Sequence, residues 1–377
     1  MPRPELTGAS LHVDLAALQR NYRRLADAAS PGLAGAAVKA DAYGLGLTPV
    51  CRALWEAGCR SFFVAFPHEG EDLRTILPDA EIFVLNGLMA GEAPYYAAHR
   101  LIPALAQPAE LAEWADFCRA RGEKLAAAIH FDTGIHRLGF SESQLRAIAP
   151  ADLASFTLAL VMSHLAHADM PGSEMNTRQI AEFERLAGLL PKARRSLANS
   201  PGTLGPKAAV MDLARPGIAL YGGNPFGAGP NPFEVVACLS APVLQLCEVA
   251  AGEGIGYSSS FITRRASRIA IIGVGYGDGY PRALSSGPEG GPARVFIEGR
   301  HAPLVGRISM DMLAVDVTDV PGVERGSRAE LLGDHVSLEE LARLSGTISY
   351  EILTRLGSRH ARIYSELESL TQGSATP

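Results

Sequence analysis

Short apolar runs and amphipathic segments alternate along the first 220 residues. The apolar runs lie at 36–40, 62–66, 82–86, 101–106, 125–131, 158–164, 194–200 and 217–222. Strands as apolar as these are typical of a parallel sheet that is covered on both faces. The intervening segments have helical periodicity: in 14–28, for example, Leu15, Leu18, Tyr22 and Leu25 share one face. Eight strands with helices between them predict a (β/α)8 barrel of the TIM type.

An open, doubly wound sheet is the alternative fold for this half of the chain. That fold usually carries a Gly-rich phosphate loop directly after its first strand. No GxGxxG sequence follows the run at 36–40. The closed barrel is therefore the preferred prediction.

The pattern changes near residue 230. A Gly/Pro-rich stretch at 227–233 precedes β-type runs at 243–250, 268–275, 293–299 and 312–319, with turn sequences between them. Short helices are expected at 337–344 and 350–356, and the last dozen residues are expected to be disordered. The prediction is an α/β chain, with a barrel domain over 1–230 and a mostly β domain over 231–377. In this prediction the first ten or so residues can pack with the second domain although they precede the barrel in the chain.

Charge and composition limit the classes of partner. The chain has 34 basic and 40 acidic residues, and the net charge of −6 gives no reason to expect nucleic acid or an anionic membrane. No apolar run approaches the roughly 18 residues of a membrane span, and the N-terminus lacks the apolar core of a secretory signal. Five cysteines without a CxxC pair predict neither a disulfide scaffold nor a metal site. A cytoplasmic enzyme is the resulting expectation.

Polar residues gather at the C-terminal ends of the predicted strands, where a barrel carries its active site. They are Lys39 and Tyr43 after the first strand, 132–137 after the fifth, His164 at the sixth, Asn199 and Ser200 at the seventh, and Arg215 with 217–218 around the eighth. Cations beside small hydroxyl and glycine positions suit an anionic ligand that carries phosphate. A lysine at the tip of a buried strand loses its proton readily through desolvation and can form a Schiff base.

Nine segments resemble motifs of the alanine racemase family, in the family's order and over nearly the whole chain. They are AVKADAYGLG (37–46), FDTGIHRLGF (131–140), SHLAHAD (163–169), LANS (197–200), ARPGIALYG (214–222), GEGIGYSSSF (252–261), IGVGYGDGYPR (272–282), VGRISMDM (305–312) and YEIL (350–353). The resemblance implies pyridoxal 5'-phosphate (PLP) as cofactor. It also implies racemisation of L- and D-alanine by two bases, either to supply D-alanine for peptidoglycan or to catabolise it.

The resemblance assigns a role to each matching residue. Lys39 is implied as the PLP lysine and one base, and Tyr257 of the partner subunit as the opposing base. The implied cofactor-binding residues are Lys39, Tyr43, His164, Asn199, Ser200, Arg215, Gly217, Ile218 and Tyr350, and the implied substrate-binding residues are Arg137, Met310 and Asp311. Because several of these would come from the other copy, the resemblance implies a homodimer with shared active sites.

Other functions stay open at this point. An amino-acid racemase of broader specificity, acting for instance on serine, would share all of these motifs. A barrel-type PLP decarboxylase shares the two-domain plan, but Cys238 and Cys247 precede Tyr257, and the later β-domain motifs hold no cysteine to protonate a product. A PLP-binding homeostasis protein shares the barrel and the lysine but lacks the second domain.

One position departs from the pattern of many family members. Those members carry a carbamylated lysine seven residues before the motif arginine, and its negative charge holds the guanidinium. Seven residues before Arg137 this chain has His130, and a neutral histidine brings no negative charge. The expectation is that Asp132 or a bound anion such as chloride balances Arg137, with His130 as a packing residue in the blander alternative.

Overall fold

The computed structural model describes residues 8–227, 229–365 and 367. The last dozen residues, which were expected to be disordered, therefore lie outside the described residues, with the exception of residue 367. Two compact units divide the chain: Leu18–Leu220, and the residues before Leu18 together with those from Tyr221 onward. The sequence placed the division between residues 230 and 231, inside the Gly/Pro-rich stretch at 227–233, and the division into compact units lies ten residues earlier. Each unit is described by itself.

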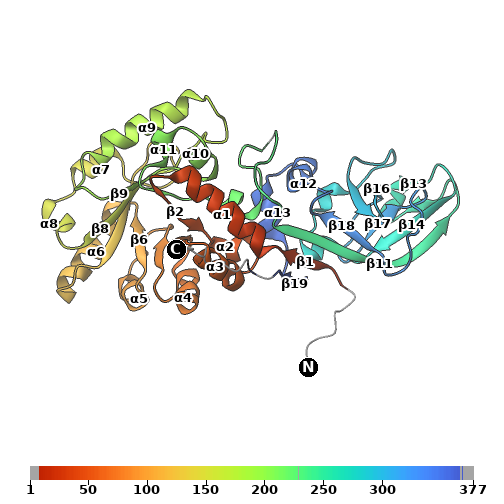
Figure 1. The fold of residues 1–377 in the computed structure, drawn as a ribbon, viewed down its shortest axis with the longest axis horizontal. Coiled ribbons are helices and arrows are strands. Elements are labelled where there is room, and N and C mark those ends of the chain that lie inside the picture. The colour runs from red at the N-terminus through yellow and green to blue at the C-terminus, as the bar shows by residue number, and fades with distance from the viewer. Residues whose placement is uncertain (1–7, 228, 366, 368–377) are drawn as a thin grey trace, which may run out of the picture. The chain divides into compact units, whose positions relative to one another are not determined.

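The unit Leu18–Leu220 is a barrel of eight strands (Figure 1). Seven form one parallel sheet in chain order: β3 (Ala36–Ala37), β4 (Ser61–Val64), β5 (Glu81–Val84), β6 (Ile102–Leu105), β7 (Ala126–His130), β8 (Thr157–Met162) and β9 (Arg194–Ser196). The eighth, β10 (Leu213–Ala214), pairs in parallel with β2 (Leu33–Ala34), which leads directly into β3. On its other side, the Asp212 N–H donates to the Arg195 carbonyl at 3.1 Å. The ring is closed, and the predicted barrel is confirmed.

The eighth strand lies earlier than the sequence pattern suggested. The residues expected as a strand at 217–222 form instead a 3-10 turn, η1 (Ile218–Tyr221). The last donor toward β9 is the Arg215 N–H, which reaches the Ala198 carbonyl at 2.8 Å. Pro216 follows, and proline has no N–H with which to continue the ladder. The apolar character of 217–222 reflects burial of the turn, not a strand.

Helices cover the outside of the barrel (Figure 1). They are α1 (Leu15–Ala29), α3 (Leu47–Glu56), α4 (Pro67–Ile76), α5 (Ala93–Ala98), α6 (Pro108–Arg121) and α9 (Glu174–Ala187), with the short α7 (Glu142–Arg146), α8 (Pro150–Leu153) and α11 (Lys207–Val210). Two further short segments, α2 (Lys39–Tyr43) and α10 (Ser200–Leu204), follow strands at the mouth of the barrel. Leu18, Tyr22 and Leu25 of α1 are buried, as the amphipathic pattern predicted.

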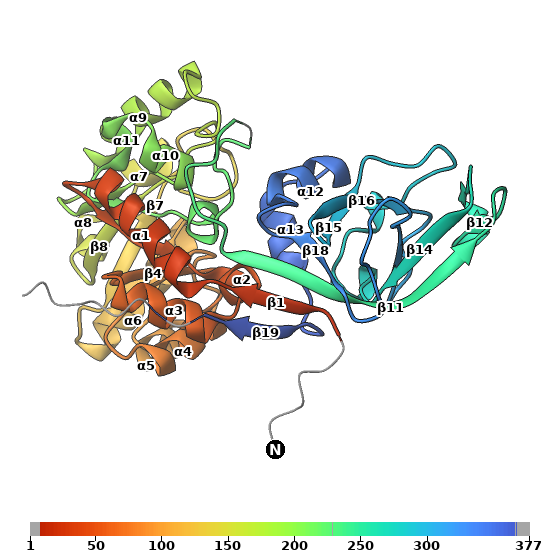
Figure 2. The ribbon, with the colours of Figure 1, turned by 45° about the vertical axis from the view of Figure 1, so that its right-hand side comes forward.

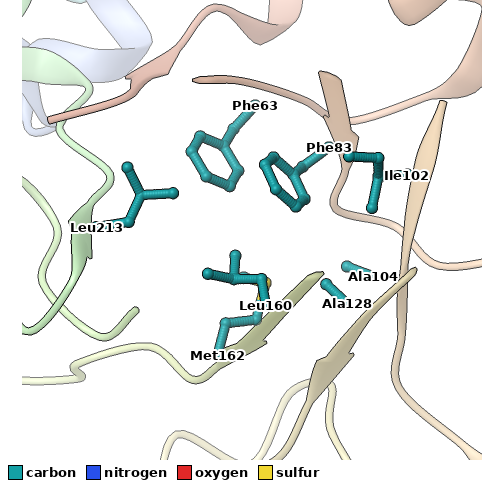
Figure 3. Packing of buried hydrophobic residues seen from close by; sticks show 8 residues of the cluster. All are labelled: Phe63, Phe83, Ile102, Ala104, Ala128, Leu160, Met162 and Leu213. Atoms are coloured by element: carbon teal, nitrogen blue, oxygen red, sulfur yellow. The ribbon is translucent and has the colours of Figure 1, made fainter. Parts of the chain in front are cut away.

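Apolar side chains fill the interior of the barrel (Figure 3). Phe63 and Phe83 stack with ring centroids 4.9 Å apart. Around them pack Ile102, Ala104, Ala128, Leu160, Met162 and Leu213. The barrel is therefore a packed core with no channel, and a ligand is accommodated at the mouth formed by the strand ends.

The second unit is mostly β (Figure 2). Its eight-stranded sheet has the order β14 (Ser267–Ile272), β17 (Leu313–Asp316), β16 (Arg300–Val305), β15 (Arg294–Ile297), β18 (Arg328–Leu332), β11 (Ala237–Val249), β1 (Ser10–Val13) and β19 (Ala361–Tyr364). β14 also pairs with β11, so the antiparallel strands from β14 to β11 close on themselves. β1 pairs with β11 and β19 pairs with β1, so residues 10–13 belong to this unit.

Smaller elements complete the second unit. β12 (Gly254–Ile255) and β13 (Phe261–Ile262) form a hairpin around η2 (Tyr257–Ser259), and η3 (Tyr276–Asp278) and η4 (Arg282–Leu284) follow β14. The two predicted short helices are present as α12 (Leu338–Ser345) and α13 (Ser349–Arg355). A search of the described residues for a helix both long and apolar enough to cross a membrane finds none.

Candidate active site

Lys39 stands at the C-terminal end of the first barrel strand, where the sequence placed it. It follows β3 after Val38 and begins α2, whose residues Ala40, Asp41 and Ala42 have φ of 55°, 54° and 52°. The turn is therefore left-handed. Burial lowers the pKa of Lys39, the positive charge of Arg137 lowers it further, and Glu69 opposes them. A lysine in this environment gives up its proton more readily than a hydrated one.

Tyr43, Ser200 and Gly217 meet at the ends of the first, seventh and eighth strands. The Ser200 hydroxyl accepts the N–H of Gly217 at 2.8 Å and that of Ala219 at 3.3 Å. A Cβ placed on Gly217 would lie 2.3 Å from the Tyr43 hydroxyl oxygen, so only glycine allows this approach. The Tyr43 and Ser200 hydroxyls therefore meet at the strand ends, with Ser200 held in place by two backbone N–H groups, and they form a cradle in which both hydroxyls can donate to an anion.

Asn199 and Ile218 frame the cradle. Asn199 caps α10, since its side-chain oxygen accepts the Gly202 N–H at 3.1 Å. Ile218 is fully buried and begins η1. The Asn199 side chain thus fixes the start of α10 by a hydrogen bond, and Ile218 anchors the start of η1 by burial. The sequence had grouped both with the cofactor-binding residues.

Arg215 lies fully buried beside the cradle, with its guanidinium 5.9 Å from the centre of the Phe63 ring. It donates to the Ser196 hydroxyl and to the Ser163 carbonyl. Burial lowers its pKa to about 9, so it remains a cation at neutral pH. No carboxylate from the described ranges pairs with it, and one positive charge at the mouth is left uncompensated.

His164 contacts Arg215 from the end of the sixth strand. Arginine has no acceptor, so the contact of 3.4 Å between the Arg215 guanidinium and His164 Nδ1 places the ring proton on Nε2. Burial is the main cause that holds the pKa of His164 well below its ordinary value, and Arg215 adds to it. His164 is therefore neutral.

Asp132 does not balance Arg137, contrary to the expectation from sequence. Its Oδ1 accepts the backbone N–H groups of Gly134 and Ile135 at 3.0 Å each, and its Oδ2 lies 2.9 Å from Nδ1 of His136. A carboxylate followed closely by free backbone N–H groups satisfies itself locally, which the sequence argument had not considered. Arg137 is exposed and forms neither a hydrogen bond nor an ion pair with the residues that the structure describes.

His130 ends β7 inside the barrel, close to these cations. It is 4% exposed, and neither ring nitrogen has a hydrogen-bond partner in the described structure. Burial, followed by Arg215 and Arg137, lowers its pKa to about 4. A neutral, buried ring supplies no charge to hold Arg137.

Four predicted site residues lie in the second unit. Tyr257 in η2 is 69% exposed, and Tyr350 in α13 is also exposed. Met310 and Asp311 share the turn between β16 and β17. The structure thus brings together the barrel residues of the prediction, and separately places these four on the surface of the β unit.

Sequence reasoning missed several residues that support the site. Glu69 of α4 accepts the Ala40 N–H at 2.7 Å. Arg359 binds Asp311 at 2.9 Å and the nearly buried Asp278 at 3.3 Å. The sequence does contain one signal for Glu69: it is an acidic residue in the first turn of a helix that begins with proline, a pattern typical of a helix N-terminus. Arg359 left none, because its partners are distant in the chain. No group of His, Cys, Asp and Glu able to hold a metal occurs among the residues described.

Comparison with known proteins gives a consistent result. The model of the alanine racemase N-terminal domain matches residues 13–225, and that of the alanine racemase C-terminal domain matches residues 236–364. Alanine racemase of Methylobacterium sp. (strain 4-46) is 46% identical over 360 residues, 95% of this chain and 98% of the relative. The catabolic alanine racemase of Rhizobium johnstonii is also 46% identical, over 94% of each chain.

Solved structures agree with the sequence matches. The alanine racemase of Bartonella henselae, which holds covalently bound pyridoxal phosphate, superposes with a TM-score of 0.91 at 39% identity, over 96% of this chain and all of that one. The biosynthetic enzyme of Pseudomonas aeruginosa gives 0.85 at 34%, with the same two coverages. Because both domain models match, a barrel-only PLP-binding protein is set aside. The chain belongs to the alanine racemase family.

Proposed function

We propose that this protein interconverts L-alanine and D-alanine with PLP as cofactor. The observation that carries the proposal is the set at the barrel mouth: a lysine of lowered pKa, an anion cradle, and a buried arginine that forms no ion pair with a carboxylate of the described residues. The family match gives that set its chemical meaning. The D-alanine formed would supply peptidoglycan, and in the reverse direction D-alanine would be catabolised.

The residues at the mouth fit PLP. Tyr43, Ser200 and the backbone at Gly217 would hold its phosphate, since they form a cradle that a single Cβ would fill. Lys39 would be the residue joined to it. Arg215 would face the pyridine nitrogen, where its uncompensated cation disfavours a proton on the ring.

Racemisation requires a proton to leave one face of Cα and another to arrive on the opposite face. PLP, when bound, delocalises the negative charge that remains after the α-proton has left. Lys39 exchanges the proton on one face, and its lowered pKa increases the fraction of free amine near neutral pH. Tyr257 of the partner subunit exchanges the proton on the other face. Arg137, which pairs with no carboxylate in the described part of the chain, binds the carboxylate of the substrate.

The active unit is a homodimer with two shared sites. Large apolar side chains stand exposed on the β unit, among them Tyr257, Met310, Met312, Ile348 and Tyr350. An exposed group of this kind suits burial against another chain, and two-fold symmetry would give each site both bases. Met310 and Asp311 would then contact the substrate bound to the other copy. The proposed location is the cytoplasm.

One experiment tests the function directly. The purified chain, supplied with PLP, is incubated separately with L-alanine, L-serine and L-lysine, and each product is resolved by chiral chromatography. Formation of D-alanine at a rate that far exceeds that of the Lys39→Ala variant supports the proposal. Conversion of serine or lysine at a similar rate would broaden the substrate class, and failure to racemise any of the three would refute the function.

A further inference from the structure

The backbone after Lys39 adopts a conformation that its residues disfavour. Ala40, Asp41 and Ala42 have ψ of 53°, 48° and 53° with the positive φ given above, and Tyr43 continues with φ of 58°. The left-handed conformation costs an L-residue about 1–2 kcal/mol. Such strain persists only where surrounding contacts impose it, and it concentrates at functional sites. The contacts that impose this turn therefore also hold the lysine with which it begins.

Hydrogen bonds within the segment hold the far end of the turn. The Gly44 N–H donates to the Ala40 carbonyl at 2.8 Å. The side chain of Asp41 accepts the N–H of Leu47, the first residue of α3, at 2.7 Å. These contacts join the end of the turn to the following helix. At the near end, next to Lys39, the Ala42 N–H donates to the Val38 carbonyl at 2.9 Å across the lysine, and a carboxylate from a different element holds the peptide that follows the lysine.

Glu69 holds the near end. Its Oε1 accepts the N–H of Ala40 at 2.7 Å, and its Oε2 accepts those of Ala65 at 2.7 Å and Phe66 at 3.0 Å. Ala65 and Phe66 directly follow β4, the neighbour of β3 in the barrel. One carboxylate thus joins the peptide after the lysine to the end of the adjacent strand. Hydrogen bonds to an ionised acceptor are about twice as strong as neutral ones.

Glu69 is also the negative charge that faces Lys39. The groups that face the lysine are Glu69 from α4, Arg137 from the loop after β7, and His164 from the end of β8. Arg137 disfavours the protonated amine and Glu69 favours it, while His164 is neutral. Loss of the Glu69 charge would remove the negative charge that opposes Arg137 at the amine, as far as the described residues show.

We propose that Glu69 is a positioning residue for Lys39. Its two oxygens fix the strained turn that carries the lysine, and its charge sets how readily the amine gives up its proton. The catalytic meaning rests on the function proposed above, but the effect of Glu69 on the Lys39 amine does not. Glu69 acts through Lys39 and is not itself assigned a contact with the substrate.

Chemical labelling measures that effect without catalysis. The chain has four lysines, Lys39, Lys124, Lys192 and Lys207. The full-length protein, freed of PLP, is acetylated with acetic anhydride between about pH 6 and about pH 10, and mass spectrometry follows each lysine peptide. Lys124 and Lys192 are exposed and serve as internal references.

Glu69→Gln is the test substitution. Glutamine keeps one acceptor oxygen and replaces the other by an amide donor, so it cannot serve both sides of the bridge. We expect the midpoint of Lys39 labelling to fall by about 0.5 pH unit, equivalent to about threefold higher reactivity at neutral pH. Asp72→Asn removes an exposed carboxylate from the same helix and should leave the midpoint unchanged.

The holoenzyme supplies the second readout. Glu69→Gln should lower kcat for alanine by about tenfold or more, because the amine is no longer held in place, as expected when orientation is lost. In the direction of racemisation in which Lys39 accepts the proton, the acidic limb of the pH profile should shift in the same direction as the labelling midpoint. If Glu69→Gln does not fold, Glu69→Asp keeps the charge but shortens the reach by one methylene; it should retain the wild-type midpoint and still lose kcat.

The outcomes separate the two proposals. A Lys39 midpoint that is identical in wild type and Glu69→Gln, with only lower thermal stability, would overturn the inference, and so would an unchanged kcat. A wild-type protein that does not racemise alanine but shows the shifted midpoint in Glu69→Gln would refute the function and leave Glu69 as the residue that positions the lysine.

Discussion

Acid should destabilise this protein through His130, and the structure gives the size of the effect. The ring is buried and its two nitrogens lack partners, so the native state resists the proton that the unfolded chain accepts. Burial, Arg215 and Arg137 lower its pKa to about 4, with Asp132 opposing them, against an ordinary value of about 6.5. The contribution to stability is complete above about pH 6.5 and is lost as the pH falls toward about 4.

The magnitude follows from proton linkage. A difference of about 2.5 pH units corresponds to about 3 kcal/mol once the pH has fallen below both values, at about 1.36 kcal/mol per unit. At about pH 5 the unfolded ring is almost fully protonated and the native ring is not. The stability lost between about pH 7.5 and about pH 5 is therefore about 2 kcal/mol. That is a large part of the stability of an ordinary domain.

Urea unfolding of wild type and His130→Leu at these two pH values measures the loss. Leucine has no titratable group and no nitrogen to leave unsatisfied, so His130→Leu should lose about 2 kcal/mol less stability than wild type over the same interval. His164 and His360 are also held below their ordinary pKa by burial, but they remain in both proteins and cancel in the comparison. His12→Gln replaces an exposed histidine and controls for the substitution itself. Equal losses in wild type and His130→Leu would refute the reasoning.

Three further predictions concern the site. Lys39→Ala and Tyr257→Phe should each abolish racemisation. A mixture of the two inactive proteins should regain part of the activity, because some mixed dimers hold one intact site. An inactive mixture that has exchanged subunits would contradict the shared site. Gly217→Ala should weaken PLP binding by about tenfold or more in a fluorescence titration, since its Cβ would lie 2.3 Å from a hydroxyl oxygen, whereas Gly205→Ala, whose Cβ meets nothing closer than 3.4 Å, should bind normally. Racemisation should not depend on bicarbonate, because His130 stands seven residues before Arg137, where many other family members carry the carbamylated lysine, and Lys39 is the lysine assigned to PLP. KM for alanine should respond to chloride if an anion balances Arg137, and a KM that follows bicarbonate would oppose this.

The fold was largely predictable because its main signals are local. Runs of apolar residues at regular intervals identified the barrel strands, and Lys39 fell at a strand tip for the same reason. The eighth strand was misplaced, because burial makes a turn such as η1 as apolar as a strand. Only the missing N–H of Pro216 distinguishes the two.

The supporting contacts of the site were less predictable. Aspartate tolerates positive φ but alanine does not, so the sequence Ala40–Asp41–Ala42 does not predict a left-handed turn. Glu69, 29 residues beyond Ala40, is one of the groups that hold it. Asp132 was assigned to Arg137 by proximity in sequence, but nearer backbone N–H groups compete for its oxygens. Residue type and strand position thus locate a site, while its hydrogen bonds depend on tertiary packing.

The assembly of the second unit from both ends of the chain determines the order in which the protein can fold during synthesis. β1 leaves the ribosome first, but its two neighbours are β11, which ends at Val249, and β19, which ends at Tyr364. All eight barrel strands lie between β1 and β11 in the chain, so the barrel can form while β1 is still an unpaired edge. A nascent chain of which about the first 230 residues have emerged from the ribosome should therefore protect the barrel strands from proteolysis and leave residues 10–13 open to cleavage.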